Sequence, residues 1–411
     1  MPLQLNGLDK ILYISYDGMT DPLGQSQVIP YLSGLSQNGY QITILSVEKK
    51  GKLSENGEYI SKLLSSFGIK WEYNLFTQNP PLLSKFYDLE RLKWKALALQ
   101  KKNKYRLIHC RSYVAAQVGL MLKKKFGVKF LFDMRGFWVD ERVDGGLWDL
   151  KKPIYRALYS RYKKKEKDFI KGAEAIISLT QAGKDEIMSW PTYKGQPIAV
   201  IPCSADFDLF TLTNDTEKKK SREKLGLAPE NYVVSYLGSL GTWYLIDEML
   251  DFFSVVKKNI ASAKFLFITR DDFEHVKQKA LNKNINENDL VFTSASREEV
   301  ALYAKASDVS LSFIKPCYSK IASSPTKLGE LWAMGIPVIS NSGVGDVKLL
   351  TQETGAGYVI TSFTEKAMEE ALLVVRNIKV TPDEIRTNAF GYYDLNKMQQ
   401  RYSQVYKDLL F

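Results

Sequence analysis

Short apolar runs alternate with longer amphipathic stretches along the whole chain of 411 residues. The runs have the length of buried strands, and the stretches between them have the spacing of helices. This alternation is typical of an α/β protein with parallel sheets. The expected strands of the first half begin at Lys10, Gln41, Arg106, Lys129, Glu174 and Ile198, and those of the second half at Tyr232, Lys264, Asp289, Asp308, Pro337 and Gly357.

The pattern restarts after the segment CSADFDLF, residues 203–210. We therefore expect two doubly wound, Rossmann-like domains, 1–205 and 206–390, with ligands beyond the carboxyl ends of their strands and a cleft between the domains. Clear helical patterns cover 84–104, 112–126 and 150–171. The last amphipathic stretch, 391–411, has no strand after it, and we expect it to form a helix that packs back on the first domain.

The positive charge of the chain is confined to its first half. The net charge is +11, and residues 1–205 hold 32 basic and 19 acidic residues, a balance of +13, which leaves −2 for the remainder. An anionic partner for the first half is indicated: a membrane surface, a phosphorylated lipid or a nucleic acid. No motif for nucleic-acid recognition supports the last choice. The cationic stretches Lys85–Arg106 and Lys151–Lys171 carry aromatic residues, so each is a candidate for interfacial membrane binding or for an ordinary protein face.

Cysteine and histidine are sparse and scattered. The three cysteines lie about a hundred residues from one another, and the two histidines are also far apart, which predicts neither a disulfide framework nor a metal cluster and fits a reducing cytoplasm. The pair Asp206 and Asp208 could bind a metal, but its place between the domains favours a linker feature. No apolar run approaches the ~20 residues of a membrane span, and the N-terminus lacks the pattern of a signal peptide. We expect a cytoplasmic protein, with peripheral attachment to the inner face of the cell membrane as an option.

The segment from Ser323 to Asp346 contains a cation at an unfavourable place. Ser324 reads as an N-cap and Pro325 as the first helical residue, which puts Lys327 in the first turn, where the helix dipole opposes it. A phosphate at this helix end would explain the choice. The alternatives are a solvated Lys327, or an ion pair between Lys327 and Glu330 one turn later.

Three segments resemble the two-domain GT-B glycosyltransferases, family 4 in particular: GQSQVIPYLSGLSQNGYQITILS from Gly24, IPCSADFDLF from Ile201, and PTKLGELWAMGIPVISNSGVGD from Pro325. The resemblance implies transfer of a sugar from a nucleotide-sugar donor with retention of configuration, and it implies neither a metal nor any other cofactor. The acceptor would be a saccharide or a lipid-diphosphate-linked saccharide.

The resemblance also implies a donor site in the second half. Glu330 stands at the second signature glutamate, which bonds the ribose, whereas the first signature position is Ala322. The usual arginine and lysine for the diphosphate are replaced by Ser239 and Tyr244, so Lys327 is expected to supply that contact. The donor-binding candidates are Gly238, Ser239, Arg270, Ser324, Thr326, Lys327 and Glu330. Trp243 and Tyr244 would stack on the base or fill the core.

On the acceptor side, the loop candidates are Gly18, Gly24 and His109, and the catalytic candidates are Arg111, Asp133 and Arg135. His109 could instead be a packed residue, and Asp133 and Arg135 could simply pair with each other. The expected function is glycosyl transfer in bacterial surface-glycan synthesis. A nucleotide-sugar epimerase of the same fold and a catalytically inactive binding protein are the alternatives. The base, sugar, acceptor, linkage and oligomeric state stay open.

Overall fold

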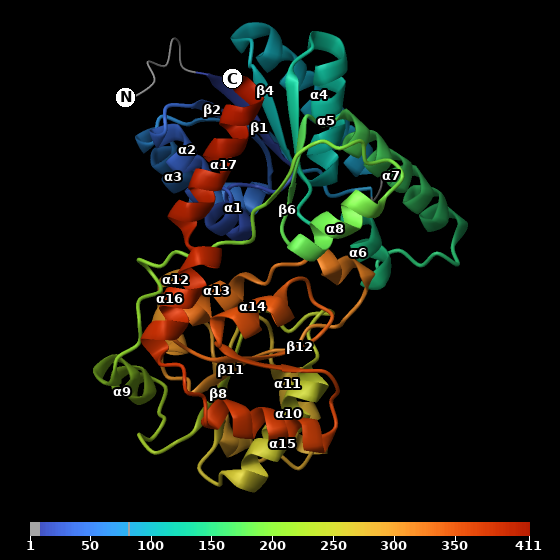
Figure 1. Ribbon diagram of the computed structural model, residues 1–411. Helices are drawn as coiled ribbons and strands as arrows, with labels where there is room; N and C mark the ends of the chain where they lie inside the picture. Colours follow the sequence, from blue (N-terminus) through green and yellow to red (C-terminus); the bar gives the residue numbers. More distant parts are fainter. Residues whose placement is uncertain (1–8, 81–82) are drawn as a thin grey trace. The chain divides into compact units, whose positions relative to one another are not determined.

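The computed structural model describes residues 9–80 and 83–411. The chain forms two compact units, each built around its own parallel sheet (Figure 1). Unit 1 contains the chain up to Pro202 together with Leu395–Phe411, and unit 2 contains Cys203–Asp394. The C-terminal segment therefore belongs to the first unit, although it follows the second in sequence.

Unit 1 has a seven-stranded sheet in the order β3-β2-β1-β4-β5-β6-β7, and its neighbouring strands pair in parallel. Its strands are β1 (Lys10–Ser15), β2 (Gln41–Glu48), β3 (Lys70–Leu75), β4 (Leu107–Arg111), β5 (Lys129–Asp133), β6 (Ala175–Ser178) and β7 (Ile198–Val200). Its helices are α1 (Pro22–Gln27), α2 (Ile29–Gln37), α3 (Lys50–Ser66), α4 (Leu83–Asn103), α5 (Ser112–Phe126), α6 (Trp138–Asp144), α7 (Pro153–Gly172), α8 (Gln181–Ser189) and α17 (Leu395–Leu410).

Unit 2 has a six-stranded parallel sheet in the order β10-β9-β8-β11-β12-β13. Its strands are β8 (Val233–Leu237), β9 (Lys264–Ile268), β10 (Leu290–Thr293), β11 (Val309–Ser312), β12 (Val338–Asn341) and β13 (Gly357–Ile360). Its helices are α9 (Asp215–Lys224), α10 (Ile246–Asn259), α11 (Glu274–Asn282), α12 (Arg297–Ala304), α13 (Thr326–Ala333), α14 (Val347–Thr354), α15 (Glu365–Arg376) and α16 (Pro382–Tyr393), with 3-10 turns at Glu287–Asp289 and Tyr318–Ala322.

All twelve strands expected from apolar runs are present, and the fold class is confirmed. The additional strand, β3, lies at the edge of the first sheet and has the sequence KWEYNL. An edge strand is covered on fewer sides, so it does not need the continuous apolar run of a central parallel strand. The sequence pattern therefore did not reveal it.

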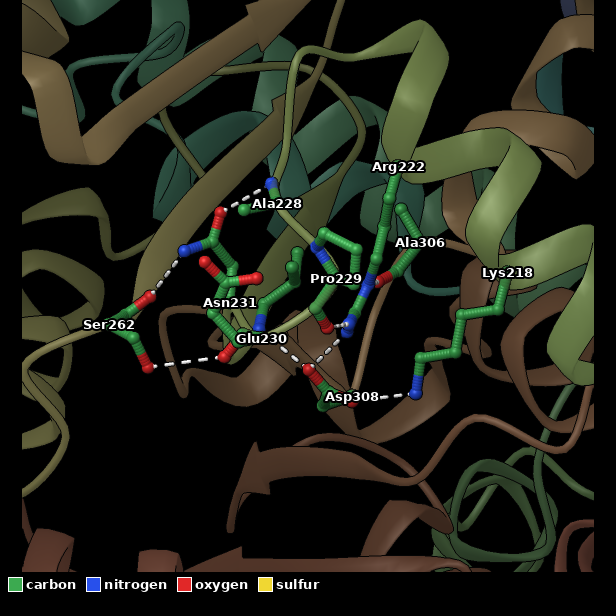
Figure 2. Close-up of polar contacts among 10 residues, drawn as sticks. Lys218, Arg222, Ala228, Pro229, Glu230, Asn231, Ser262, Ala306 and Asp308 are labelled. Atoms are coloured by element: carbon green, nitrogen blue, oxygen red, sulfur yellow. Dashed lines mark hydrogen bonds and ion pairs between the residues drawn. The ribbon is translucent and has the colours of Figure 1, made fainter.

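A polar network fastens helix α9 to the amino-terminal edge of the second sheet (Figure 2). The Asp308 carboxylate binds Lys218 at 2.6 Å and Arg222 at 2.7 Å, and it accepts the backbone N–H of Val233 at 2.7 Å. Arg222 also donates to the carbonyls of Ala306 and Pro229. These charges are satisfied within the fold, at the edge opposite to the one where ligands of α/β proteins bind.

Candidate functional site

The carboxyl edge of the second sheet brings together the loops that follow strands β8, β11 and β12. Strands β8, β11 and β12 are neighbours in the sheet, so the loops that follow them share one edge. The loop after β8 contains Gly238 and Ser239, and the loop after β11 leads into helix α13. This edge is where a doubly wound fold places its ligand.

Helix α13 begins one residue later than predicted. Pro325 is the N-cap, with an extended backbone (φ −69°, ψ 112°), and Thr326 is the first helical residue. Ser324 does not cap the helix, because its Oγ accepts the backbone N–H of Cys203 at 3.2 Å. The start of α13 thus has no side-chain cap among the described residues, and of its first-turn amides that of Leu328 donates to the Pro325 carbonyl at 3.1 Å. Lys327 is the second residue of the helix.

The Lys327 ammonium lies between two tyrosine rings. Its Nζ is 4.4 Å from the ring centre of Tyr236 on β8 and 4.1 Å from that of Tyr244 in the following loop. The side chain is 8% exposed, and among the described residues Nζ has no hydrogen-bond partner. The predicted alternative of a solvated lysine is therefore wrong. The two ring faces thus contact a buried ammonium at the positive end of a helix.

Burial lowers the pKa of Lys327 to about 7, and the negative charge of Glu330 opposes this shift. An anion beside Nζ would favour the charged ammonium and raise this pKa again. The site is thus prepared for a ligand that brings negative charge.

Gly238 lets Lys327 reach its position. The residue has a φ of +135°, and a Cβ there would lie 3.0 Å from Nζ of Lys327 and 3.4 Å from the hydroxyl of Tyr236. A side chain would therefore strain the backbone and press on the ammonium. Ser239, the next residue, is exposed and accepts a hydrogen bond from the Tyr236 hydroxyl through its carbonyl.

Glu330 pairs with Arg297, which the sequence analysis missed. Nη1 of Arg297 lies 3.2 Å from Oε1 of Glu330. Burial raises the pKa of Glu330, and the guanidinium of Arg297 opposes that shift. Arg297 is the first residue of α12 and follows the N-cap Ser296. Its place just after a strand, at the carboxyl edge of the sheet, was the signal that could have identified it.

The remaining residues of the predicted donor site lie in loops at the same edge of the sheet. Arg270 is exposed, and its Nε donates to the carbonyl of Ala295 at 2.8 Å. Trp243 lies under Nζ of Lys320, 3.6 Å from the ring centre, so this tryptophan binds a cation rather than filling the core. Ala322, at the altered signature position, is buried. The first-turn residue Thr326 is half-buried.

In unit 1, Glu48 organises the loop that contains Gly18. The buried carboxylate of Glu48 accepts the N–H of Met19 at 2.7 Å and both the N–H and the hydroxyl of Thr20, at 3.2 and 2.6 Å. A Cβ on Gly24 would lie 2.2 Å from the carbonyl oxygen of Gly18, so this position requires glycine. Glu48 is a second residue that the sequence analysis missed, although it ends a predicted strand.

His109 and Asp133 lie beneath helix α17, and both are 1% exposed. The hydroxyl of Tyr402 donates to Oδ2 of Asp133 at 3.1 Å, and Nδ1 of His109 lies 2.8 Å from the hydroxyl of Tyr406. Nε2 of His109 is 3.5 Å from Oδ2 of Asp133. Burial lowers the pKa of His109, which favours the neutral imidazole, and Asp133 opposes this shift. His109 is therefore a packed residue, and Asp133 is covered by α17. The catalytic role of Asp133 stays a prediction.

Two guanidiniums stay close to this buried pair at the carboxyl ends of β4 and β5. Arg111 is 5% exposed, and its Nε lies 3.4 Å from Oδ2 of Asp17. Burial alone would raise the pKa of Asp133, but Arg135, the strongest opposing charge, and then His109 and Arg111 hold it below its ordinary value. Arg135 has a positive φ of 55°, a conformation that non-glycine residues seldom adopt.

The Asp206–Asp208 segment forms a turn. Oδ1 of Asp206 accepts the N–H groups of Asp208 and Leu209 at 3.0 and 3.1 Å. Within 9–80 and 83–411 there is no group of three or more histidine, cysteine or acidic side chains placed to hold a metal ion. In the same ranges, no helix is long and apolar enough to cross a membrane.

Two models of glycosyltransferase families match consecutive parts of the chain. The family model described as "Glycosyltransferase Family 4" matches residues 26–209, and that described as "Glycosyl transferases group 1" matches residues 217–390. A D-inositol 3-phosphate glycosyltransferase from Segniliparus rotundus is 22% identical over 137 residues, which are 33% of this chain. The match spans only 28% of that relative's length.

Solved structures share the fold over nearly the full chain. A sucrose-phosphate synthase from Thermosynechococcus elongatus has a TM-score of 0.73 at 16% identity, covering 98% of this chain and 99% of that one. Anabaena HepE, solved with UDP and glucose, has a TM-score of 0.71 at 15% identity, covering 97% and 100%. A glycosyltransferase from Rickettsia africae has a TM-score of 0.70 at 16% identity, covering 98% and 99%.

Proposed function

Because the chain belongs to glycosyltransferase family 4 and is a transferase of the GT-B fold, we propose that unit 2 binds a nucleoside-diphosphate sugar and unit 1 the acceptor. The observation that carries this proposal is Lys327, a buried ammonium without a hydrogen-bond partner among the described residues, at the uncapped start of α13. A diphosphate is the anion that suits a helix N-terminus beside a lysine. HepE, solved with UDP and glucose, supports a uridine nucleotide as the first donor to test.

Each donor-side residue has a place in this scheme. Lys327 and the first-turn amides of Thr326 and Lys327 would hold the diphosphate, and Gly238 would let it approach β8. Glu330, oriented by Arg297, would accept hydrogen bonds from the ribose hydroxyls. Ser239, Arg270 and Ser324 would shape the surrounding loops. As the sugar leaves with retention of configuration, negative charge grows on the diphosphate, and a cation held in a poorly hydrated pocket stabilises it most at that moment.

The acceptor is proposed to be a saccharide carried on a lipid diphosphate, used in bacterial surface-glycan synthesis. Support comes from the balance of +13 over residues 1–205 and from the Arg111 and Arg135 guanidiniums at the sheet edge of unit 1. These two arginines would bind acceptor phosphate next to the loop that Glu48 and Gly24 hold in place.

The first prediction concerns Lys327→Met, which removes the charge but keeps a long apolar side chain between the tyrosines. We expect kcat to fall by about 10²–10³-fold, a loss of about 3–4 kcal/mol of transition-state stabilisation, with a smaller rise in KM for donor. Glu330→Gln should mainly raise KM, because ribose contacts are equal in the ground and transition states. The measurement is donor-dependent initial rate with a UDP-sugar panel and an acceptor lipid extract.

Lys305→Met is the matched control. Lys305 is another buried lysine of unit 2, but its Nζ is paired with Glu217 at 2.7 Å and with Thr211 at 2.8 Å. This variant should keep wild-type donor kinetics. Wild-type kinetics in Lys327→Met would remove the main support for the donor site. Conversion of the nucleotide sugar to its epimer without acceptor would favour the epimerase alternative, and binding without turnover would favour a binding protein.

A further inference from the structure

Helix α4 is apolar on the side that faces solvent. Four large side chains on it are highly exposed: Leu83 at 69%, Phe86 at 59%, Tyr87 at 55% and Trp94 at 72%. At 100° per residue these positions fall within an arc of ~100°, one face of the helix. Leu89, Leu92 and Ala96 are buried on other sides, against the body of unit 1. We call the four exposed residues the α4 face.

The edge strand β3 extends this apolar surface. Tyr73 and Leu75 are 39% and 40% exposed, and α4 is bonded to both residues. Nζ of Lys95 donates to the carbonyl of Tyr73 at 2.8 Å, and Nη1 of Arg91 reaches the carbonyl of Leu75 at 3.5 Å. Large exposed apolar side chains gathered on one helix face and on the strand beside it usually mark a place of interaction.

Positive charge surrounds the α4 face. Helix α4 has six basic residues (Lys85, Arg91, Lys93, Lys95, Lys101 and Lys102) and two acidic ones (Asp88 and Glu90), a balance of +4. Both acids are occupied: Asp88 accepts from the hydroxyl of Tyr16 at 3.1 Å, and Glu90 pairs with Lys93 at 2.6 Å. Lys101 and Lys102 are exposed. The field that this helix presents is therefore cationic, and an anionic partner complements it.

The other cationic helix, α7, has a different role. The hydroxyl of Tyr159 donates to Asp140 of α6 at 2.8 Å, and the Tyr162 ring packs on Trp138, with centroids 5.2 Å apart. Lys163 is paired with Asp140 at 3.0 Å and with Glu166 at 2.5 Å. The aromatic stripe of α7 therefore contacts its own unit, and of the two candidate stretches only α4 offers exposed aromatics.

We propose that the α4 face docks unit 1 on an anionic lipid bilayer. Tryptophan, tyrosine and phenylalanine would enter the headgroup region, while Arg91, Lys101 and Lys102 bind lipid phosphates. The start of α4 lies beside the carboxyl end of β1, since Asp88 bonds Tyr16 and Nζ of Lys85 is 6.0 Å from the Tyr16 ring centre. The bilayer would therefore adjoin the acceptor-side loop, which deepens the proposed function by requiring a membrane-borne acceptor.

The experiment is sedimentation of the full chain with vesicles, without any nucleotide sugar, so that its outcome is separate from that of the transfer assay. Wild-type protein should bind vesicles with 30% phosphatidylglycerol at least about tenfold more tightly than pure phosphatidylcholine vesicles, and added salt should weaken the binding. The double variant Phe86→Ser/Trp94→Ser should lose about tenfold in partition. Tyr59→Ser on α3 is the matched control, because Tyr59 is 63% exposed and lies outside the α4 face.

A second pair of variants tests the charge contribution. Lys101→Gln/Lys102→Gln should weaken binding to the anionic vesicles, while Lys219→Gln/Lys220→Gln, two exposed lysines of α9 in unit 2, should not. Equal binding to neutral and anionic vesicles would overturn the proposal, as would full binding by Phe86→Ser/Trp94→Ser. The proposal would also be overturned if the wild-type protein were a dimer that binds no vesicles and the variant Phe86→Ser/Trp94→Ser were a monomer. The α4 face would then join two copies of the chain.

Discussion

Nζ of Lys327 lies between two aromatic faces and has no hydrogen-bond partner among the described residues. Neutral Lys327 is favoured by its burial, so its pKa falls to about 7 from the ordinary 10.5. Between these values the unfolded chain binds more protons than the folded one, so unliganded stability should rise with pH across that window. A difference of one in the pKa between the folded and the unfolded chain corresponds to about 1.4 kcal/mol in the free energy of unfolding. The burial of Lys327 thus lowers the stability of the unliganded folded state, and a bound anion would offset this loss.

This coupling gives a prediction for donor binding. When a nucleotide sugar binds beside Lys327 above pH 7, the complex should take up about one proton, because the bound diphosphate favours the charged lysine. The Kd of the nucleotide sugar should therefore rise above pH 7 by up to about tenfold per pH unit. Below pH 7 the residue is already charged and Kd should level off. Calorimetry at pH 8 in buffers of different ionisation enthalpy measures the proton uptake directly. Lys327→Met should bind more weakly, with no proton uptake and with a Kd independent of pH; unchanged uptake in this variant would assign the proton to another group.

At the scale of elements, helix α17 decides the character of the predicted acceptor site. Its residues Met398, Tyr402 and Tyr406 are buried, and the two tyrosine hydroxyls reach Asp133 and His109. Gln399 donates to the carbonyl of Pro30 at 2.9 Å, where α2 passes close by. The helix is therefore packed on unit 1, and it covers two polar residues, His109 within β4 and Asp133 at the end of β5.

The double variant Tyr402→Phe/Tyr406→Phe tests this role. It removes the hydroxyl partners but keeps the rings, so it should destabilise unit 1 by about 2–6 kcal/mol, at about 1–3 kcal/mol for each of the two buried polar groups left without a partner. Hydrogen exchange should accelerate across α17 and the ends of β4 and β5. Tyr59→Phe, at an exposed position on α3, is the control and should leave exchange unchanged. Unaltered exchange in the double variant would show that packing alone holds α17.

At the scale of the whole molecule, charge and chemistry are divided between the units. The excess of basic residues lies in the first half of the sequence, while the second half is nearly balanced and contains Lys327. Neither unit has, among its described residues, a cluster of ligands suited to a metal ion. In the proposed scheme, Lys327 and the start of α13 supply the positive charge that the leaving diphosphate needs.

Transfer should accordingly survive chelation. Initial rates in EDTA should stay within about twofold of those with added Mg²⁺ or Mn²⁺, because the protein itself supplies the positive charge. The assay needs the enzyme purified without divalent ions, with an authentic metal-dependent transferase as the positive control for chelation. Complete loss of activity in EDTA, restored by either ion, would contradict this scheme.

The sequence by itself determined the elements that buried apolar runs and glycine stops encode. Twelve strands, the parallel architecture and the end of α13 near Gly335 follow from local patterns, because a central parallel strand must be apolar along its length. The unfavourable position of Lys327 was also visible in the sequence, because the positive end of a helix dipole lies wherever the helix begins.

Only the tertiary structure decided which partners meet. Tyr236 and Tyr244 around Lys327, Arg297 beside Glu330, and α17 over Asp133 and His109 all join segments distant in sequence. The exposed aromatics of α4 and the covered ones of α7 have similar sequence patterns, because helical periodicity shows that residues share a face but not what that face contacts. Burial and pairing are properties of the folded units. They decide whether a residue of a given type lies in a candidate binding site, in the packed core or on an exposed surface.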